Sequence, residues 1–145
     1  MFIDDGIKKR VDQFLNLSEP NMGDALGIEF TSFKPDEVKA TMPVDENTVQ
    51  PFGILHGGAS VALAETLASI GAWLNVKDDS KTAVGIEINA NHLRSVKKGS
   101  RVMGTATPVH IGRSVQVWET AIETEEGKLV CISRCTLAIV DRGER

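Results

Sequence analysis

The segment 57–74, GGASVALAETLASIGAWL, carries one charged side chain, Glu65, among residues that are otherwise apolar or small. Alanine and leucine dominate this segment and proline is absent, so its composition predicts a helix. A helix that is apolar on every side is expected to be buried. A membrane span is disfavoured, because Glu65 lies at the centre of the segment, where a charge in lipid is costly. The rest of the chain is therefore expected to wrap around one buried helix.

Composition and length set the broad class of the protein. A chain of 145 residues that is 41% hydrophobic and 25% charged is typical of a single globular domain, here spanning residues 1–145. The formal net charge of −4 and the lack of a basic run disfavour nucleic-acid binding. The N-terminal stretch MFIDDGIKKRVDQFL has charges throughout and lacks the apolar core of a signal peptide, which favours a cytoplasmic location.

The two cysteines, Cys131 and Cys135, lie in LVCISRCTLAIV, a stretch that predicts a strand. Four residues of a strand span about 13 Å, which exceeds the limit of roughly 7 Å between the Cα atoms of a disulfide. Both cysteines are therefore expected to be buried, reduced thiols. The chain has three histidines and two cysteines, none at zinc-ligand spacing, so no metal site is expected.

The extended segments flank the predicted helix on both sides. They cover residues 28–34, 37–44, 82–93, 102–110, 113–123 and 128–140. The turn sequences KKGS, HIG and EEGK separate the last four, which predicts a long antiparallel meander. In the segment 82–93, alternation places Val84, Ile86, Ile88 and Ala90 on one face. With a short amphipathic helix in DDGIKKRVDQFLN, the pattern predicts an α+β fold in which a sheet curls around the buried helix.

The start of the buried helix is a candidate site for carbonyl chemistry. His56, Gly57 and Gly58 lie where a loop becomes the helix. The first turn of a helix has unpaired N–H groups and a partial positive charge, and glycine lets a ligand oxygen approach the backbone closely. These groups could polarise a carbonyl under attack.

The spacing of Gly57 and Glu65 predicts a site that is shared between two chains. Glu65 follows eight residues after Gly57, which is about 12 Å along a helix axis. The two groups of one chain cannot grip the same carbonyl at that separation. If both act on one substrate, the acid must come from a second copy of the chain, as a two-fold dimer allows.

Two more polar residues could assist the same reaction. Ser69 lies one turn after Glu65 on nearly the same face and could position water or substrate. Gln50 could donate to the same carbonyl as the Gly57 N–H. Structural interpretations remain open, because a Gly-Gly pair often forms only a tight turn, a mid-helix serine is often merely small, and a buried glutamate is commonly paired. The arginines available for such a pair are Arg94, Arg113 and Arg134.

QPFGILHGGASVALAETLAS, followed by GIEINANHLRS, resembles the hotdog-fold acyl-CoA thioesterases. The likeness is strongest to the aryl-CoA branch, which includes the 1,4-dihydroxy-2-naphthoyl-CoA thioesterases of menaquinone synthesis and the enterobactin proofreading thioesterases. It extends from about Asn21 to Val140. It implies a long helix wrapped by a curved antiparallel sheet of five to six strands. It also implies homodimers with shared active sites that commonly pair into tetramers.

The resemblance implies roles for individual residues. Glu65 would be the nucleophile or the general base, while the Gly57 N–H and Gln50 would polarise the thioester carbonyl. His56 would lie beside the thioester, and Ser69 would position water or the acyl group. The substrate-binding candidates are His92, Phe52, Arg94, Arg113 and Ser114. No cofactor or metal is expected, because coenzyme A is part of the substrate and its thiolate is a good leaving group.

The expected reaction is hydrolysis of an aromatic, hydroxyaryl CoA thioester to the free acid and CoA. One alternative is a thioesterase of broad specificity for medium-chain or phenylacetyl-CoA. A hydratase or dehydratase on the same fold is a second, and a non-catalytic acyl-CoA-binding module is a third. Release of free thiol distinguishes hydrolysis from hydration, which changes the absorbance of an enoyl group instead.

Overall fold

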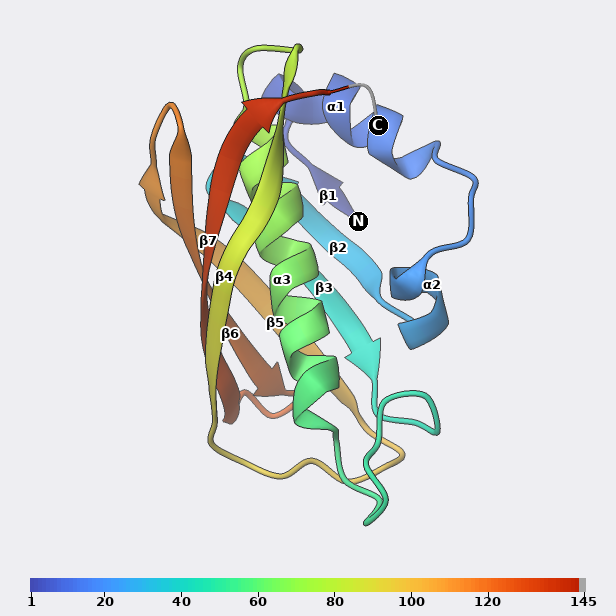
Figure 1. Cartoon of the computed structure of the whole chain (residues 1–145). Coiled ribbons are helices and arrows are strands. Elements are labelled where there is room, and N and C mark those ends of the chain that lie inside the picture. Colours follow the sequence, from blue (N-terminus) through green and yellow to red (C-terminus); the bar gives the residue numbers. More distant parts are fainter. Residues whose placement is uncertain (144–145) are drawn as a thin grey trace.

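The computed structural model of the chain describes residues 1–143. One sheet of seven strands curves around helix α3 (Gly57–Leu74), as Figure 1 shows. The strands are β1 (Phe2–Ile3), β2 (Glu29–Lys34), β3 (Glu37–Pro43), β4 (Lys81–His92), β5 (Arg101–Ile111), β6 (Val115–Thr124) and β7 (Leu129–Asp141). Their order across the sheet is β1-β2-β3-β5-β6-β7-β4, and only β1 and β2 pair in parallel. The sequence predicted five to six of these strands and missed β1.

Helix α3 has the bounds that its composition predicts, and it is fixed to the sheet by packing and by buried hydrogen bonds. A β-carbon at Gly71 would lie 2.7 Å from the Trp118 ring, so only glycine allows this close approach. The Trp118 Nε1–H donates to Gln116 Oε1 at 2.9 Å, and Gln116 Nε2 donates to the Ala72 carbonyl at 3.1 Å. Because all these groups are buried, their pairing strongly favours one position of α3 on the sheet.

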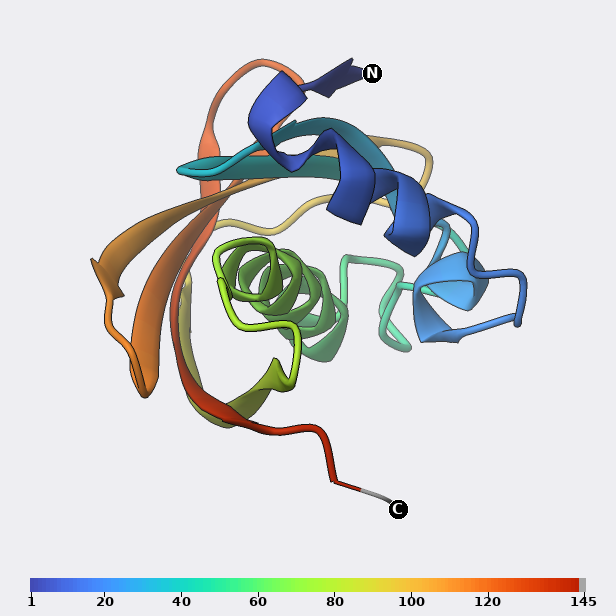
Figure 2. The ribbon, with the colours of Figure 1, turned by 90° about the horizontal axis from the view of Figure 1, so that it is seen from above.

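The N-terminal segment covers the end of the sheet that carries β2. Helix α1 (Lys8–Leu15) follows a short 3₁₀ turn and lies over β2, as Figure 2 shows. Its Phe14 ring packs edge-on against Phe30, with ring centroids 5.2 Å apart. The predicted N-terminal helix is confirmed. A second short helix, α2 (Met22–Leu26), was not predicted, although Asn21 and Asp24 form a capping box at its start.

Arg10 of α1 ties this segment to the C-terminal end of α3. Its guanidinium donates to the Trp73 carbonyl at 2.7 Å and lies over the Trp73 ring at 5.5 Å. The same group pairs with Asp79 at 2.9 Å. A cation at the last carbonyls of a helix stabilises its negative end, so α1 also helps to hold α3 in place.

The prediction of a simple meander was wrong at the KKGS turn. Strand β4 does not pair with β5: it pairs with β7 at the edge of the sheet, while β5 lies between β3 and β6. The connection 93–100 crosses the end of the molecule and pairs with the loop before α3. The Leu55 N–H donates to the Val96 carbonyl and the Gly99 N–H to the Val44 carbonyl, both at 2.8 Å. These contacts join distant segments, which a local turn sequence does not reveal.

The predicted face of β4 was also partly wrong. A bulge between Gly85 and Glu87 shifts the register with β7, so the alternation changes phase at that point. Ile88 and Ala90 still pack against the core, but Ile86 lies in the bulge and is 61% exposed. Val84 pairs with Ala138 of β7, and it does not lie on the same face of the sheet as Ile88.

Cys131 and Cys135 are free and buried on β7, as predicted. No helix within residues 1–143 is both long and apolar enough to cross a membrane.

Candidate active site

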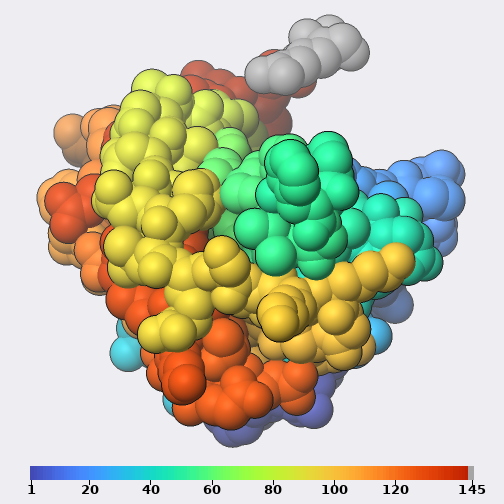
Figure 3. All heavy atoms as spheres, turned by 90° about the horizontal axis from the view of Figure 1, so that it is seen from below, coloured from blue at the N-terminus to red at the C-terminus, as the bar shows by residue number. Residues whose placement is uncertain are grey.

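A cavity of about 420 Å³ lies at the N-terminal end of α3. Its lining residues are Gln50, Ile54, Leu55, Gly57, Ser60, His92, Leu93, Arg94, Ser95 and Val130. Figure 3 views the molecule from this end, where the green segment near residue 55 lies beside the yellow segment near residue 92. Of the residues that the sequence singled out, the structure brings together four here: Gln50, Gly57, His92 and Arg94.

The Gly57 N–H is a backbone donor that is available in this cavity. His56 is the N-cap of α3, and its Nδ1 accepts the Gly58 N–H at 2.8 Å. The His56 carbonyl accepts the Ala59 N–H at 3.0 Å. Within residues 1–143, no hydrogen bond uses the Gly57 N–H. This group therefore presents an unpaired donor at the positive end of the helix dipole.

His56 itself has a defined orientation. An Nδ1 that accepts a hydrogen bond carries no proton, so the ring proton of the neutral imidazole is on Nε2. The cap orients the ring beside the start of α3 rather than inside the cavity, whose lining does not include His56.

Gln50 is held by its own loop with one donor group free. Its side-chain Oε1 accepts the Phe52 N–H, and its backbone N–H donates to the Ile54 carbonyl at 2.9 Å. Because Oε1 is occupied, the Nε2 amide is the end of the side chain that is left to donate. Phe52 at the tip of the loop is 90% exposed and contributes no wall to this cavity.

His92 and Arg94 form the opposite wall of the cavity. A β-carbon at Gly57 would lie 2.9 Å from His92 Nε2, so the imidazole lies directly against the first turn of α3. Arg94 is exposed and forms no ion pair with any residue of the described chain. Its guanidinium is therefore available to an anionic ligand at the mouth of the cavity.

Glu65 is half-buried on α3. Its carboxylate forms no hydrogen bond or ion pair within residues 1–143, and Arg134, one of the expected partners, pairs with Glu119 instead. A β-carbon at Gly85 would lie 2.7 Å from Glu65 Oε1. The carboxylate thus touches β4 at its bulge, and bulges are frequent beside active sites.

The negative charge of the Glu65 carboxylate affects the pKa of the Cys135 thiol. Burial, and after it the negative charges of Glu65 and Glu87, raise the pKa of the Cys135 thiol to about 11. A thiol with such a pKa stays protonated and unreactive near neutral pH. Cys135 is therefore a core residue next to Glu65 and not a nucleophile.

Glu65 does not reach the cavity of its own chain. Neither Glu65 nor Ser69, which lies one turn further along α3 and is half-buried, is among the residues that line it. The separation of Gly57 and Glu65 along the axis of α3 is about 12 Å. One protomer therefore has Gln50 and Gly57 in this cavity and the Glu65 carboxylate in a different place.

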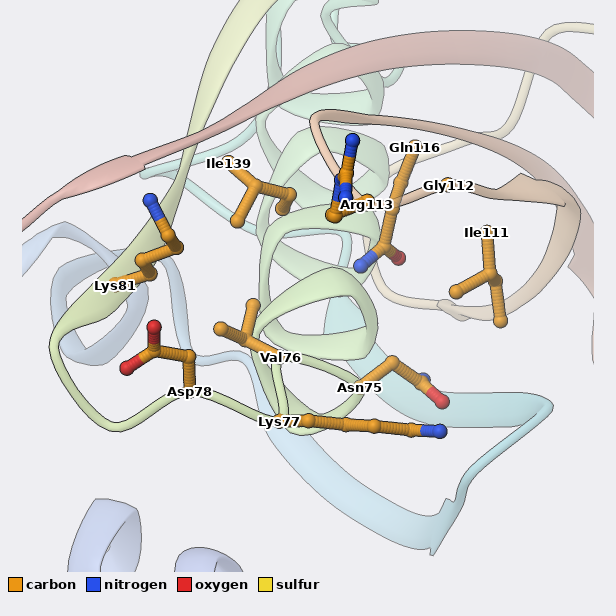
Figure 4. Close-up of a pocket in the computed structure, with 10 residues that line it drawn as sticks. All are labelled: Asn75, Val76, Lys77, Asp78, Lys81, Ile111, Gly112, Arg113, Gln116 and Ile139. Atoms are coloured by element: carbon orange, nitrogen blue, oxygen red, sulfur yellow. The ribbon is translucent and has the colours of Figure 1, made fainter.

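Arg113 lies in a second cavity, of about 410 Å³, at the C-terminal end of α3. Figure 4 shows its ten lining residues, which combine an apolar wall with three cationic side chains and the carboxylate of Asp78. The cations are Lys77, Lys81 and Arg113. Lys81 also pairs with Asp141 at 2.9 Å. Ser114 is exposed in the same turn as Arg113 but does not line the cavity.

Sequence reasoning missed several polar residues that line these cavities, among them Lys77, Lys81 and Ser60. Lys77 and Lys81 share the second cavity with Arg113, and the sequence carries no signal that joins them. Ser60 shares the first cavity with Gly57. Because residues three apart lie on one face of a helix, the spacing of Gly57 and Ser60 could have identified it.

Comparison with known proteins finds similarity to thioesterases. A family model described as the thioesterase superfamily matches residues 52–131. A 1,4-dihydroxy-2-naphthoyl-CoA hydrolase from Escherichia coli is 49% identical over 124 residues, which cover 86% of this chain and 90% of that protein. The proofreading thioesterase EntH from Cronobacter turicensis is 50% identical over 115 residues, which cover 79% and 82%. The crystal structure of a thioesterase from Haemophilus influenzae matches with a TM-score of 0.82 and 48% identity, covering 94% of this chain and 92% of that one.

The position of Glu65 can be tested by titrating Cys135. Glu65→Gln removes a nearby negative charge, so the thiolate becomes easier to form and the pKa of Cys135 should fall. It should stay above its ordinary value, because burial is the largest cause. The measurement is thiolate ultraviolet absorbance against pH in a Cys131→Ala background, which no tyrosinate obscures because the chain has no tyrosine.

Glu87→Gln is the matched control for this titration. It removes the more weakly acting of the two charges, so it should lower the pKa of Cys135 by less. An unchanged titration in Glu65→Gln would show that the carboxylate does not face Cys135.

Proposed function

The chain belongs to the thioesterase superfamily, and on that premise we propose that it hydrolyses an aromatic, hydroxyaryl CoA thioester to the free acid and CoA. The chain has the hotdog fold and is a thioester hydrolase. The observation that carries the proposed mechanism of hydrolysis is Glu65. A half-buried carboxylate that makes no hydrogen bond or ion pair within residues 1–143 is free to take a proton from water or to attack a substrate.

The proposal requires a homodimer in which Glu65 of one chain faces Gly57 of the other. Strand β4 supports this arrangement, because it is an edge strand of twelve residues whose outer side has no partner within residues 1–143. Ile86, at 61% exposure, lies on it. Such an edge is a ready template for pairing with a second chain. A two-fold axis across β4 would set the two α3 helices antiparallel, which brings the middle of one helix towards the start of the other.

The proposed mechanism uses Gly57 and Gln50 of one chain and Glu65 of the other. The Gly57 N–H and Gln50 Nε2 donate hydrogen bonds to the thioester carbonyl oxygen and stabilise the negative charge that forms on it. Glu65 of the partner chain either attacks the carbonyl carbon or takes a proton from an attacking water, with Ser69 positioning the water or the acyl group. The carbon–sulfur bond breaks and CoA leaves as the thiolate; if Glu65 attacked directly, water then hydrolyses the acyl–Glu65 anhydride and releases the free acid. No metal or further cofactor enters these steps.

The second cavity suggests where the CoA phosphates bind. The C-terminal end of α3 is nine residues past Glu65, or about 14 Å along the axis. In an antiparallel pair, the partner's cavity with Arg113, Lys77 and Lys81 would lie beyond Gly57 at about that distance. An extended pantetheine arm covers such a span. Cations on an apolar wall suit an adenosine diphosphate group, and exposed Arg94 could add a further contact.

The aromatic acyl group is proposed from the relatives. One similar protein is named as a 1,4-dihydroxy-2-naphthoyl-CoA hydrolase and another as the proofreading thioesterase EntH. In this chain, His92 lies against Gly57 and could hydrogen-bond a ring hydroxyl of such a group. We place the reaction in the cytoplasm and in a menaquinone-type pathway, with a dimer of dimers as the expected assembly. The alternative substrate class is a medium-chain or phenylacetyl-CoA ester.

Thiol release from a panel of CoA thioesters tests the proposal. The wild-type protein should show its highest kcat/KM with the hydroxynaphthoyl or hydroxybenzoyl ester, and medium-chain and phenylacetyl esters should be poorer substrates. Glu65→Ala should lower kcat by about 10²–10⁴-fold on each ester, because it removes the base or nucleophile. Glu87→Gln, on the other face of β4, is the control and should retain wild-type rates. Wild-type rates in a folded Glu65→Ala dimer would refute the mechanism.

Charge reversal at Arg113 tests the phosphate site. Arg113→Glu should raise KM for a CoA ester by about 10-fold or more, because it replaces an attraction to phosphate with a repulsion. KM for the corresponding pantetheine ester, which has no phosphate, should not change. Lys128→Glu offers a matched control, since this exposed lysine lines neither cavity. Equal effects on both esters would show that Arg113 makes no phosphate contact.

A further inference from the structure

Ser60 is a buried residue whose hydroxyl group has no hydrogen-bond partner within residues 1–143. The residue is 1% exposed and lines the cavity at the start of α3. A serine inside a helix usually donates to the carbonyl four residues earlier, as Thr66 does to Ala62 at 2.7 Å. For Ser60 that acceptor would be the His56 carbonyl, which already accepts the Ala59 N–H at 3.0 Å and the Ser60 N–H at 3.3 Å. No hydrogen bond within residues 1–143 uses the Ser60 hydroxyl.

The unpaired hydroxyl opens onto the cavity. Among the described residues, the only sealed side-chain polar atom without a partner is the Ser133 hydroxyl, on β7. The Ser60 hydroxyl also lacks a partner but is not sealed, and the space it faces is the cavity that Ser60 lines. An acceptor inside that cavity would satisfy it.

The direction of the side chain brings this hydroxyl towards the Gly57 N–H. In a helix every Cα–Cβ bond tilts towards the N-terminus, so a side chain covers the turn before its own Cα. Ser60 lies three residues after Gly57 and on the same face. Both residues line the same cavity, so the two donors lie close to one region at the first turn of α3.

We propose that the Ser60 hydroxyl donates a hydrogen bond to the thioester carbonyl oxygen, beside the Gly57 N–H, and that this bond strengthens as the oxygen becomes an oxyanion. This inference rests on the proposed thioester hydrolysis and adds a third donor to Gly57 and Gln50. Ser60 stays covalently unchanged, and its proton remains on Oγ throughout. A residue with this role is kept at a cost to stability, because alanine would remove the unpaired hydroxyl and is the better helix former.

Ser60→Ala separates this role from a structural one. The variant should lower kcat by about 10–100-fold with KM within about twofold of wild type, since the lost hydrogen bond is made mainly in the transition state. Its Tm should be equal to or higher than that of the wild type. A structural hydroxyl would give the opposite pattern, with a lower Tm and little change in kcat. Ser60→Cys, which keeps a weaker donor of similar size, should have an intermediate kcat.

Ser133→Ala is the matched control, because it removes the other unpaired buried hydroxyl, away from the cavity. It should raise Tm without changing kcat. The proposal is overturned if Ser60→Ala retains wild-type kcat, or if its whole effect falls on KM. If the wild-type protein releases thiol and Glu65→Ala does not, these outcomes contradict only the proposed role of Ser60. Absence of thiol release by the wild type would instead count against the proposed function.

Discussion

The positions of Gly57 and Glu65 on one rigid helix govern how this protein can act. The Gly57 N–H and the Glu65 carboxylate, both unpaired within residues 1–143, are the two groups that the proposed mechanism uses. They belong to the same α3, about 12 Å apart along its axis. Bending α3 cannot close that distance, because its backbone hydrogen bonds and its packing on the sheet hold it straight. In the proposed mechanism, Glu65 therefore has to come from a second chain.

The rest of the fold fixes the two ends of α3. On the sheet side, Gln116 and Trp118 connect to the Ala72 carbonyl through buried hydrogen bonds, and Gly71 allows the helix to lie close to the Trp118 ring. At the C-terminal end, Arg10 binds the Trp73 carbonyl. At the N-terminal end, the connection 93–100 pairs with the loop that carries Gln50. The same contacts that stabilise the core therefore also set the geometry of the cavity.

Much of this arrangement could be predicted from local sequence, and the exceptions have physical causes. The bounds of α3 followed from an alanine-rich segment without proline, and the two cysteines were correctly expected to be buried thiols. The pairing of β4 with β7 was missed, because partners distant in sequence leave no local signal. The bulge at Gly85 was missed for a related reason: it lies where the Glu65 side chain meets β4, a contact that exists only in the folded chain. Of the candidate site residues, Gln50, Gly57, His92 and Arg94 share a cavity, whereas Arg113 lies at the other end of α3.

We propose that each active site takes Glu65 from one chain and Gln50 with Gly57 from the other. The most direct test mixes two inactive variants, Glu65→Ala and Gln50→Ala, under conditions that exchange subunits. If the site is shared, each mixed dimer contains one site with both substitutions and one with neither. Random mixing should then restore about a quarter of the wild-type rate of thiol release, because half of the dimers are mixed and half of their sites are intact. If the mixture stays as inactive as its components although mixed dimers form, the two groups act within one chain and the account is wrong.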